Sequence, residues 1–406
     1  MEILLLILKF LFYVITCLVA FYFLLPFVLF IFYLLSGGSK KKNALDRYKK
    51  VDDLEYDFAA IITVHQDTRF IAPFVDSFIK QIHKKFKVYV VADDCDISDL
   101  TFNDERIVLL SPPVALHSKI KSIHFAISNF KNEPDALIIF DSDNLVHPSY
   151  LFNLNRYFQK GFRVVQTHML SKNTDNTYAR LDSIGHIYYT FYERLVKMQL
   201  GMSSAILGLG IAIDYELYKE INYKKTVGGF DKKLQSQLAR KVNQIAFAED
   251  AIVYDEKVEG AEVLQKQRTR WIYSYFGHLK ESWLLTKSGL KSLNLGRILL
   301  GASMLRPPMI LLIMAVFVLV LLSFFINPNL IYLWIIIISV FVFNFIITIA
   351  TQSRQKGMMH SIKHLPLLII SQLKSLFKIK KAKQNFLKTE HKRIIFIDDL
   401  LKNEQS

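Results

Sequence analysis

The chain has 406 residues, 52% of them hydrophobic, and a formal net charge of +15. So high an apolar content excludes an ordinary soluble protein, and the length allows one large polar domain together with membrane segments. The two cysteines, Cys17 in an apolar run and Cys95 in a polar one, exclude a disulfide framework and a cysteine metal site.

The first apolar run spans residues 3–35 and predicts a transmembrane anchor over 1–36. At about 1.5 Å of helical rise per residue, this run exceeds the thickness of a hydrocarbon core of about 30 Å. A signal peptide is the alternative, but the run is longer than an apolar core of about 7–15 residues, and no small-residue cleavage site follows it. Its length permits tilt, a kink at Pro26 or, as a second alternative, a hairpin of two spans.

Strand and helix patterns alternate between residues 45 and 256, which predicts an α/β domain. Strand patterns occupy 58–64, 87–92, 107–110, 136–140 and 162–166, and helical patterns occupy 71–86 and 118–130. We therefore expect a mixed, mainly parallel sheet flanked by helices, with ligands bound at the carboxyl ends of the strands. Residues 174–225 have a mostly helical pattern, interrupted by the small-residue break Gly208-Leu209-Gly210.

Acidic residues follow two of the predicted strands. Asp141-Ser142-Asp143 follows the fourth strand. Two carboxylates one residue apart can hold a hard divalent cation, together with phosphate oxygens and water. Such a cation neutralises the charge that builds on a departing diphosphate. Asp93 and Asp94 follow the second strand, where a carboxylate can contact the base or ribose of a nucleotide. The alternative in each case is a solvated acidic turn.

Lys119, in the helical pattern 118–130, is a candidate to reach the phosphates of the same nucleotide, and a solvated helix lysine is the alternative. His65 follows the first strand and is interpreted as a loop residue. Asp231 lies at a predicted helix start, and its carboxylate can accept the proton of an attacking hydroxyl group. An acid at that place is also a good N-cap, which is the alternative, and Asp250 is a rival base.

Residues 257–300 include the pentad Gln267-Arg268-Thr269-Arg270-Trp271. The guanidinium of Arg270 can bind diphosphate oxygens in a bidentate manner, and Trp271 offers a flat face on which a sugar ring can stack. The alternative is a basic amphipathic helix on lipid, and residues 365–377 have a similar pattern.

Two further apolar runs, 308–326 and 330–350, predict two transmembrane helices within 301–351. Basic residues flank the spans on one side and are missing from the connector 327–329: they are Lys40, Lys41, Lys42, Arg354, Lys356, Lys363, Lys374 and the cluster Lys378–Lys383. The positive-inside rule therefore predicts a multi-pass protein of the plasma (inner) membrane, with the middle domain and the basic amphipathic tail 352–406 in the cytosol. Because the lysines lie beside the spans, we interpret the positive charge as attraction to anionic membrane lipids rather than to nucleic acid, for which no motif is visible.

With these residues in this order, the chain resembles the family 2 glycosyltransferases, and in particular membrane enzymes similar to cellulose, chitin and hyaluronan synthases. The resemblance covers about residues 57–290. The family pattern is D, D-x-D, T-E-D and Q-x-x-R-W, and the matching residues are Asp93, Asp141, Asp143, Gln267, Arg270 and Trp271. The stretch with Gly208 and Gly210 resembles the acceptor loop. The T-E-D motif departs: Asp231 lies 36 residues before Gln267 (267 − 231), but its neighbour is Phe230 rather than Glu.

The resemblance implies a GT-A fold and an inverting transfer from a nucleotide-sugar donor, usually a UDP-sugar, with Mg²⁺ or Mn²⁺ as cofactor. It implies donor contacts at Asp93, Asp94, Lys119, Asp141, Asp143 and Arg270, and acceptor contacts at Gln267, Trp271, Gly208 and Gly210. We expect a cell-surface or secreted polysaccharide as product. The alternatives are transfer of one sugar to a lipid carrier or headgroup, and an inactive scaffold or transport subunit of an export complex. Three spans are few for a channel, which favours an oligomer or an export partner.

Overall fold

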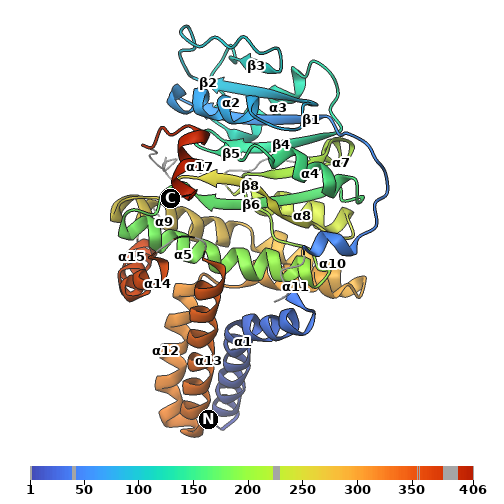
Figure 1. The fold of residues 1–406 in the computed structure, drawn as a ribbon. Helices are drawn as coiled ribbons and strands as arrows, with labels where there is room; N and C mark the ends of the chain where they lie inside the picture. Colours follow the sequence, from blue (N-terminus) through green and yellow to red (C-terminus); the bar gives the residue numbers. More distant parts are fainter. Residues whose placement is uncertain are drawn as a thin grey trace.

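The computed structural model describes residues 2–38, 43–222, 229–353, 355, 357–377 and 392–405. A domain built on one sheet stands over a layer of helices, from which three long helices project together (Figure 1). Several basic residues on which the predicted orientation depends lie outside the described residues: Lys40, Lys41, Lys42, Arg354, Lys356 and the cluster Lys378–Lys383.

One eight-stranded sheet forms the centre of the domain, in the order β3-β2-β1-β4-β7-β6-β8-β5. The strands are β1 (Phe58–His65), β2 (Phe86–Asp93), β3 (Ile107–Leu110), β4 (Ala136–Asp141), β5 (Leu145–Val146), β6 (Val164–Ser171), β7 (Ile211–Asp214) and β8 (Ala246–Asp255). Four strand pairs are parallel and three are antiparallel, so the expected mixed, mainly parallel sheet is confirmed.

Both faces of the sheet are covered, because successive side chains of a strand point to opposite faces. Ala60 and Ile62 of β1 belong to one core, with α2 (Ile71–Ile79) and α4 (Tyr150–Phe158). Ala59 and Ile61 belong to the other core, with α3 (Lys119–Ser128), α7 (Tyr215–Lys219) and α8 (Phe230–Lys241). Short turns, η2 (Ala44–Arg47) and η3 (Thr68–Phe70), complete the first half of the domain.

The region 174–225 differs from its predicted, mostly helical pattern. It contains α5 (Thr177–Thr190), the π-helical turn η4 (Phe191–Leu195) and α6 (Val196–Gln199), but then β7, which lies antiparallel between β4 and β6. The run Ile211-Ala-Ile213 is too short for its periodicity to distinguish a strand from a helix. The helix predicted over 71–86 likewise ends earlier, at Ile79.

Within the part of the chain that the structure describes, three helices are long and apolar enough to cross a membrane: α1 (Glu2–Leu35), α12 (Met309–Ile326) and α13 (Asn329–Gln352). They pack together through buried side chains that include Phe23, Leu319 and Trp334. Pro26 lies inside α1, where the missing N–H removes a helical hydrogen bond and favours a kink. The domain joins this bundle through Tyr192 of η4, whose hydroxyl group donates to Asn344 Oδ1 of α13 at 2.8 Å.

The remaining helices connect the bundle with the domain. In chain order they are α9 (Ala261–Gly277), α10 (Leu279–Lys291), α11 (Leu295–Leu305), α14 (Met358–Ser361), η5 (Ile362–His364), α15 (Leu365–Phe377) and α17 (Ile397–Gln405). Within the predicted tail 352–406, α15 lies against α9, where Ser375 Oγ donates to the carbonyl of Gln265 at 3.2 Å. The helix α17 buries Ile397 and Leu400 against the sheet residues Leu145 and Tyr254.

Phe140, the residue before Asp141, is fully buried among Phe74, Phe78 and Tyr150. Phe140→Ala removes an aromatic ring from a packed core, so we expect a loss of about 3–5 kcal/mol in the free energy of unfolding. A clearly lower thermal midpoint of the detergent-purified protein would report this loss. Phe152→Ala, at a side chain of the same type that is 50% exposed on α4, should change the midpoint far less; equal midpoints for the two variants would contradict the assigned core.

Candidate active site

The carboxyl ends of three parallel strands meet at one edge of the sheet. β1 lies between β2 and β4, and its register pairs His65 with Asp93 and Thr63 with Asp141. The acidic residues that the sequence places after two separate strands are therefore brought to the same edge, as the strand-end rule for such sheets predicts.

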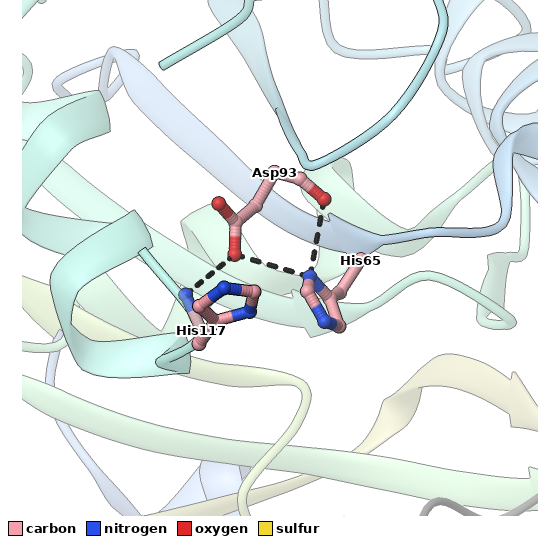
Figure 2. A group of neighbouring side chains, drawn as sticks. All are labelled: His65, Asp93 and His117. Carbon is pink, nitrogen blue, oxygen red and sulfur yellow. Dashed lines mark hydrogen bonds and ion pairs between the residues drawn. The ribbon is translucent and has the colours of Figure 1, made fainter. Parts of the chain in front are cut away.

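Asp93 is 2% exposed, and backbone amides hold both of its carboxylate oxygens. The N–H of Leu116 donates to Oδ1 at 2.6 Å, and the N–H of His117 donates to Oδ2 at 2.9 Å. His65 Nδ1 lies 3.1 Å from the carbonyl oxygen of Asp93 and 3.2 Å from its Oδ2 (Figure 2). The next residue, Asp94, has a positive φ of 55° and is exposed, and its Oδ2 accepts a hydrogen bond from Gln66 Nε2 at 2.7 Å.

Lys119 joins three parts of the site. Its ammonium group donates to Asp141 Oδ1 at 2.5 Å and to the carbonyl of Gly208 at 2.8 Å, and it lies 5.2 Å from the centre of the Phe230 ring. The Asp141 side chain is 43% exposed, so an approaching ligand has access to it. Lys119 is thus a partner of the acidic motif rather than a solvated helix lysine.

Asp143 is 3% exposed and lies among charged residues. Its carboxylate accepts the backbone N–H of Glu256 at 3.3 Å, and its carbonyl oxygen accepts a hydrogen bond from the Lys172 ammonium group. Burial lowers the pKa of Lys172, while the negative charges of Asp143, Glu256 and Asp255 oppose that shift. The Glu256 carboxylate in turn accepts the N–H groups of Lys392 and Arg393, at 2.8 and 3.0 Å.

The start of α8 is packed closely against α9. Gly229 is the N-cap residue, with a positive φ of 60°, and a Cβ atom there would collide with Ser274 Oγ and lie 2.8 Å from His278 Cε1. Glycine therefore permits both the backbone conformation and the close approach. Asp231 accordingly lies in the first turn of α8 and not at the N-cap position that the sequence suggested.

Two arginines bring positive charge to Asp231. Burial lowers the pKa of Arg270, and the charges of Asp141 and Asp231 oppose the shift, which places Arg270 within electrostatic reach of both carboxylates. Arg194 of η4 is 5% exposed; burial lowers its pKa to about 10, against the charges of Glu193 and Asp231. Lys119 and Asp141 thus form an ion pair, Arg270 lies within electrostatic reach of Asp141 and Asp231, and Arg194 lies within electrostatic reach of Asp231.

The two glycines of the predicted acceptor loop have different surroundings. A Cβ atom on Gly208 would lie 3.5 Å from the Phe230 ring, beside Lys119. Gly210 has a positive φ of 61°, and a Cβ atom on it would lie 2.5 Å from Thr167 Oγ1, so its small size serves packing on β6. The loop is therefore held against the sheet at Gly210 and borders the site at Gly208.

The side chains of the pentad on α9 (residues 267–271) also have different surroundings. Gln267 and Arg270, three residues apart, lie on one side of the helix, and Gln267 Oε1 is buried without a hydrogen-bond partner among the described residues. Trp271 is 47% exposed, and the Arg268 guanidinium lies 4.2 Å from the centre of its ring. Arg268 itself is bound by Asp182, so it acts as a structural neighbour of Trp271.

Asp250 belongs to the other face of the sheet. It lies in the irregular part of β8, where its Oδ2 accepts hydrogen bonds from Arg156 at 2.9 Å and from Asn43 at 3.2 Å. Burial raises its pKa, and the charge of Arg156 opposes that shift. Its partners come from α4 and Asn43, whereas Asp141 is paired with Lys119 of α3, so Asp250 and Asp141 are held by different parts of the fold.

The sequence analysis did not identify Lys172, Glu256, Arg194 or His117 as neighbours of the site. Lys172 follows β6, which was predicted to end at Gln166 but extends to Ser171. A correct strand end would have placed Lys172 at the ligand edge. His117 and Arg194 carry no such signal, because a loop hydrogen bond and a buried guanidinium on a helix follow only from the tertiary structure.

Comparison with known proteins agrees with this fold. No curated protein matches the chain. A mannosyltransferase from Pyrobaculum calidifontis, PcManGT, solved in complex with GDP-Man and Mn²⁺, aligns with a TM-score of 0.52 at 12% identity, over 90% of this chain and 99% of that one. Staphylococcus aureus TarS 1–349 in complex with UDP-GlcNAc aligns at 13% identity over 84% of this chain and 99% of that one, with a TM-score of 0.39.

The family model described as glycosyltransferase like family 2 matches residues 56–274, which is more than half of the chain and includes every strand of the sheet together with the pentad on α9. The mixed sheet flanked by helices is the GT-A fold that the resemblance implied, and the mannosyltransferase shares it. The chain therefore belongs to glycosyltransferase family 2 and is a nucleotide-sugar transferase.

Proposed function

We propose that this transferase is a membrane-bound, inverting enzyme that uses a nucleotide sugar, most simply a UDP-sugar, to build or extend a cell-surface or secreted polysaccharide. The observation that carries the proposal is the ion pair of Lys119 and Asp141 at the ligand edge of the sheet, with Arg270 of α9 within electrostatic reach of both Asp141 and Asp231. These residues combine cations that can bind a diphosphate with a carboxylate, that of Asp231, that can accept a proton.

The donor lies along the strand ends in this proposal. Asp93 and Asp94 contact its base and ribose, and Lys119 and Arg270 bind the diphosphate oxygens. Lys119 is paired with Asp141, and Arg270 lies within electrostatic reach of the same carboxylate. A diphosphate can bind to these cations if a metal ion accompanies the donor and binds to Asp141, or if Lys119 turns from Asp141 toward the phosphates. In either case the diphosphate lies beside Asp141.

Asp141 and Asp143 are the proposed ligands of Mg²⁺ or Mn²⁺, since hard cations prefer carboxylate oxygens. Among the described residues these two carboxylates are not part of a group of three or more ligands, so donor phosphates and water have to complete the coordination. The bound ion would neutralise charge on the departing diphosphate. The accessible carboxylate of Asp141 fits this role directly, and the buried carboxylate of Asp143 is oriented by the Glu256 amide.

Asp231 is the proposed general base. Its carboxylate accepts the proton of the acceptor hydroxyl while that oxygen bonds to the anomeric carbon of the sugar, and the bond from that carbon to the diphosphate breaks. The nucleoside diphosphate leaves with the bonding electron pair, which Lys119 and Arg270 stabilise. Attack on the face opposite the leaving group inverts the configuration. The positive charge of Arg194 lies within electrostatic reach of the carboxylate and favours its ionised form.

The acceptor approaches along α9 in this proposal, with Gln267, Trp271, Gly208 and Gly210 on its path. Gln267 Oε1, which has no hydrogen-bond partner among the residues that the structure describes, suits a sugar hydroxyl, and the half-exposed Trp271 ring suits a sugar face. The catalytic domain faces the cytosol at the plasma (inner) membrane. The three candidate spans also favour a second candidate function, transfer of one sugar to a lipid carrier or headgroup. Product length, one sugar or many, separates the two.

Replacing the proposed base should remove turnover. For Asp231→Asn we expect nucleoside diphosphate release by the detergent-purified protein, supplied with nucleotide sugars and membrane lipid extract, to fall about 10²–10⁴-fold. Asp250→Asn should retain most of the activity, because that carboxylate is held by Arg156 and Asn43 on the other face. The reverse result would make Asp250 the base.

Removing the metal should have the same effect by another route. EDTA should abolish nucleoside diphosphate release, and added Mn²⁺ or Mg²⁺ should restore it in the unmodified protein but not in Asp143→Asn. Asp53→Asn, at a side chain that is 88% exposed, is the matched control and should respond like the unmodified protein. Full activity in EDTA would rule out the proposed role of the two carboxylates.

Lys119→Met should weaken the binding of the donor. A hydrogen bond to a charged group contributes about 1.5–3 kcal/mol, so we expect kcat/KM for the donor to fall about 10–100-fold, with partial recovery in Lys119→Arg. Lys121→Met tests the loss of an exposed lysine on the same helix and should leave the donor kinetics unchanged. An equal loss in both variants would point to a general effect of charge on α3.

A further inference from the structure

A second cluster of ligating side chains lies at the same edge of the sheet. Among the described residues, His65, Asp93 and His117 offer ligand atoms that all lie within 4.8 Å of one another (Figure 2). We propose that these three residues form a binding site for a transition-metal ion of the Zn²⁺ class, separate from the pair Asp141 and Asp143, and that this ion and the nucleotide exclude each other at Asp93.

The geometry is close to that of a three-ligand zinc site. Zn–N and Zn–O bonds of about 2.0–2.1 Å at tetrahedral angles place neighbouring ligand atoms about 3.3 Å apart. His65 Nδ1 and Asp93 Oδ2 are already separated by 3.2 Å. The imidazole rings of His65 and His117 meet edge to face, with centroids 5.1 Å apart, so a small rotation of the exposed His117 side chain would bring all three ligand atoms around one ion.

The ligands are held by three different parts of the fold. His65 ends β1, Asp93 ends β2, and His117 lies in the loop before α3, where its positive φ of 47° is stabilised by the bond from its N–H to Asp93. Asp93 is buried, whereas His117 is exposed. A metal ion can therefore enter from solvent onto a carboxylate whose orientation is already fixed, and water can fill the remaining position.

Ligand chemistry separates the two metal sites. Two imidazoles and one carboxylate suit zinc, nickel and copper, whereas the oxygen-only pair Asp141 and Asp143 suits magnesium and manganese. Mg²⁺ or Mn²⁺ needed for transfer would thus leave the histidine cluster free, and zinc would fill this cluster in preference to the oxygen-only pair.

The expected consequence is inhibition by exclusion. This step rests on the proposed function, in which Asp93 contacts the base or ribose of the donor. A carboxylate that coordinates zinc through Oδ2 cannot accept a hydrogen bond from the nucleotide at the same atom, and zinc adds bulk where the base would lie. Zinc binding and nucleotide binding should then weaken each other by the same factor.

The site itself is tested by titrating Zn²⁺ into the full-length protein in detergent, in an Asp143→Asn background that disables the other metal site. We expect one zinc per chain, with the affinity lowered at least tenfold in His65→Gln and in His117→Gln. His124→Gln, at an exposed histidine on α3, is the matched control and should bind zinc like the background protein. Thermal midpoints without zinc check that each variant is folded, and zinc should raise the midpoint of the background protein but not those of His65→Gln and His117→Gln.

An unchanged zinc affinity in both His65→Gln and His117→Gln would overturn the site. Exclusion is tested separately, by the binding of UDP and of GDP to the unmodified protein with Mg²⁺, with and without saturating zinc. We expect the nucleotide that binds to do so at least tenfold more weakly with zinc, and zinc to have no effect in His117→Gln. Unchanged nucleotide binding at saturating zinc would overturn the shared use of Asp93. Because the zinc titration needs no turnover, a failure of the proposed transfer reaction would leave its result intact.

Discussion

The ion pair between Lys119 and Asp141 is the contact around which the site is organised. It joins a helix on one face of the sheet to the end of a central strand, and the same ammonium group holds the Gly208 carbonyl of the loop that leads into β7. Asp141 is also one of the two negative charges that Arg270 faces. Helices α3 and α9, the sheet and the loop are therefore held in one arrangement by groups that a bound diphosphate would compete for.

The enzyme places its most polar groups directly beside its most apolar helices. Arg194 of η4 lies within electrostatic reach of Asp231, while Tyr192 of the same turn donates to Asn344 in α13. A π-helical turn is often found at functional sites, and here it lets neighbouring side chains serve the active site and the membrane bundle. The proposed transfer, from a water-soluble donor to a product at a membrane, would use this proximity.

The strand ends were predictable from the sequence, because apolar runs have clear limits and Asp93 and Asp141 follow two of them. The grouping of Asp231 with Arg270 was suggested only by the family resemblance, since it depends on the close approach at Gly229, which no local pattern reveals. The strand β7 was missed because four apolar-rich residues inside a helical region have no decisive period. His117 and Lys172 could not be predicted as site residues because their partners, Asp93 and Asp143, are distant in sequence. His117 lies in a loop, and Lys172 follows a strand that extends beyond its predicted end.

Glu256 connects residues 392 and 393 with the acidic motif, because its backbone and its side chain bind different partners. Its N–H donates to Asp143, and its carboxylate receives the N–H groups of Lys392 and Arg393, while Arg393 also pairs with Asp175 and Glu259. Residues 392 and 393 thus cover Glu256 on the side away from the acidic motif. In protein engineering terms, the carboxyl-terminal region is a poor place to shorten the enzyme, since a truncation before residue 392 would uncover a buried glutamate that is hydrogen-bonded directly to Asp143, the proposed metal ligand.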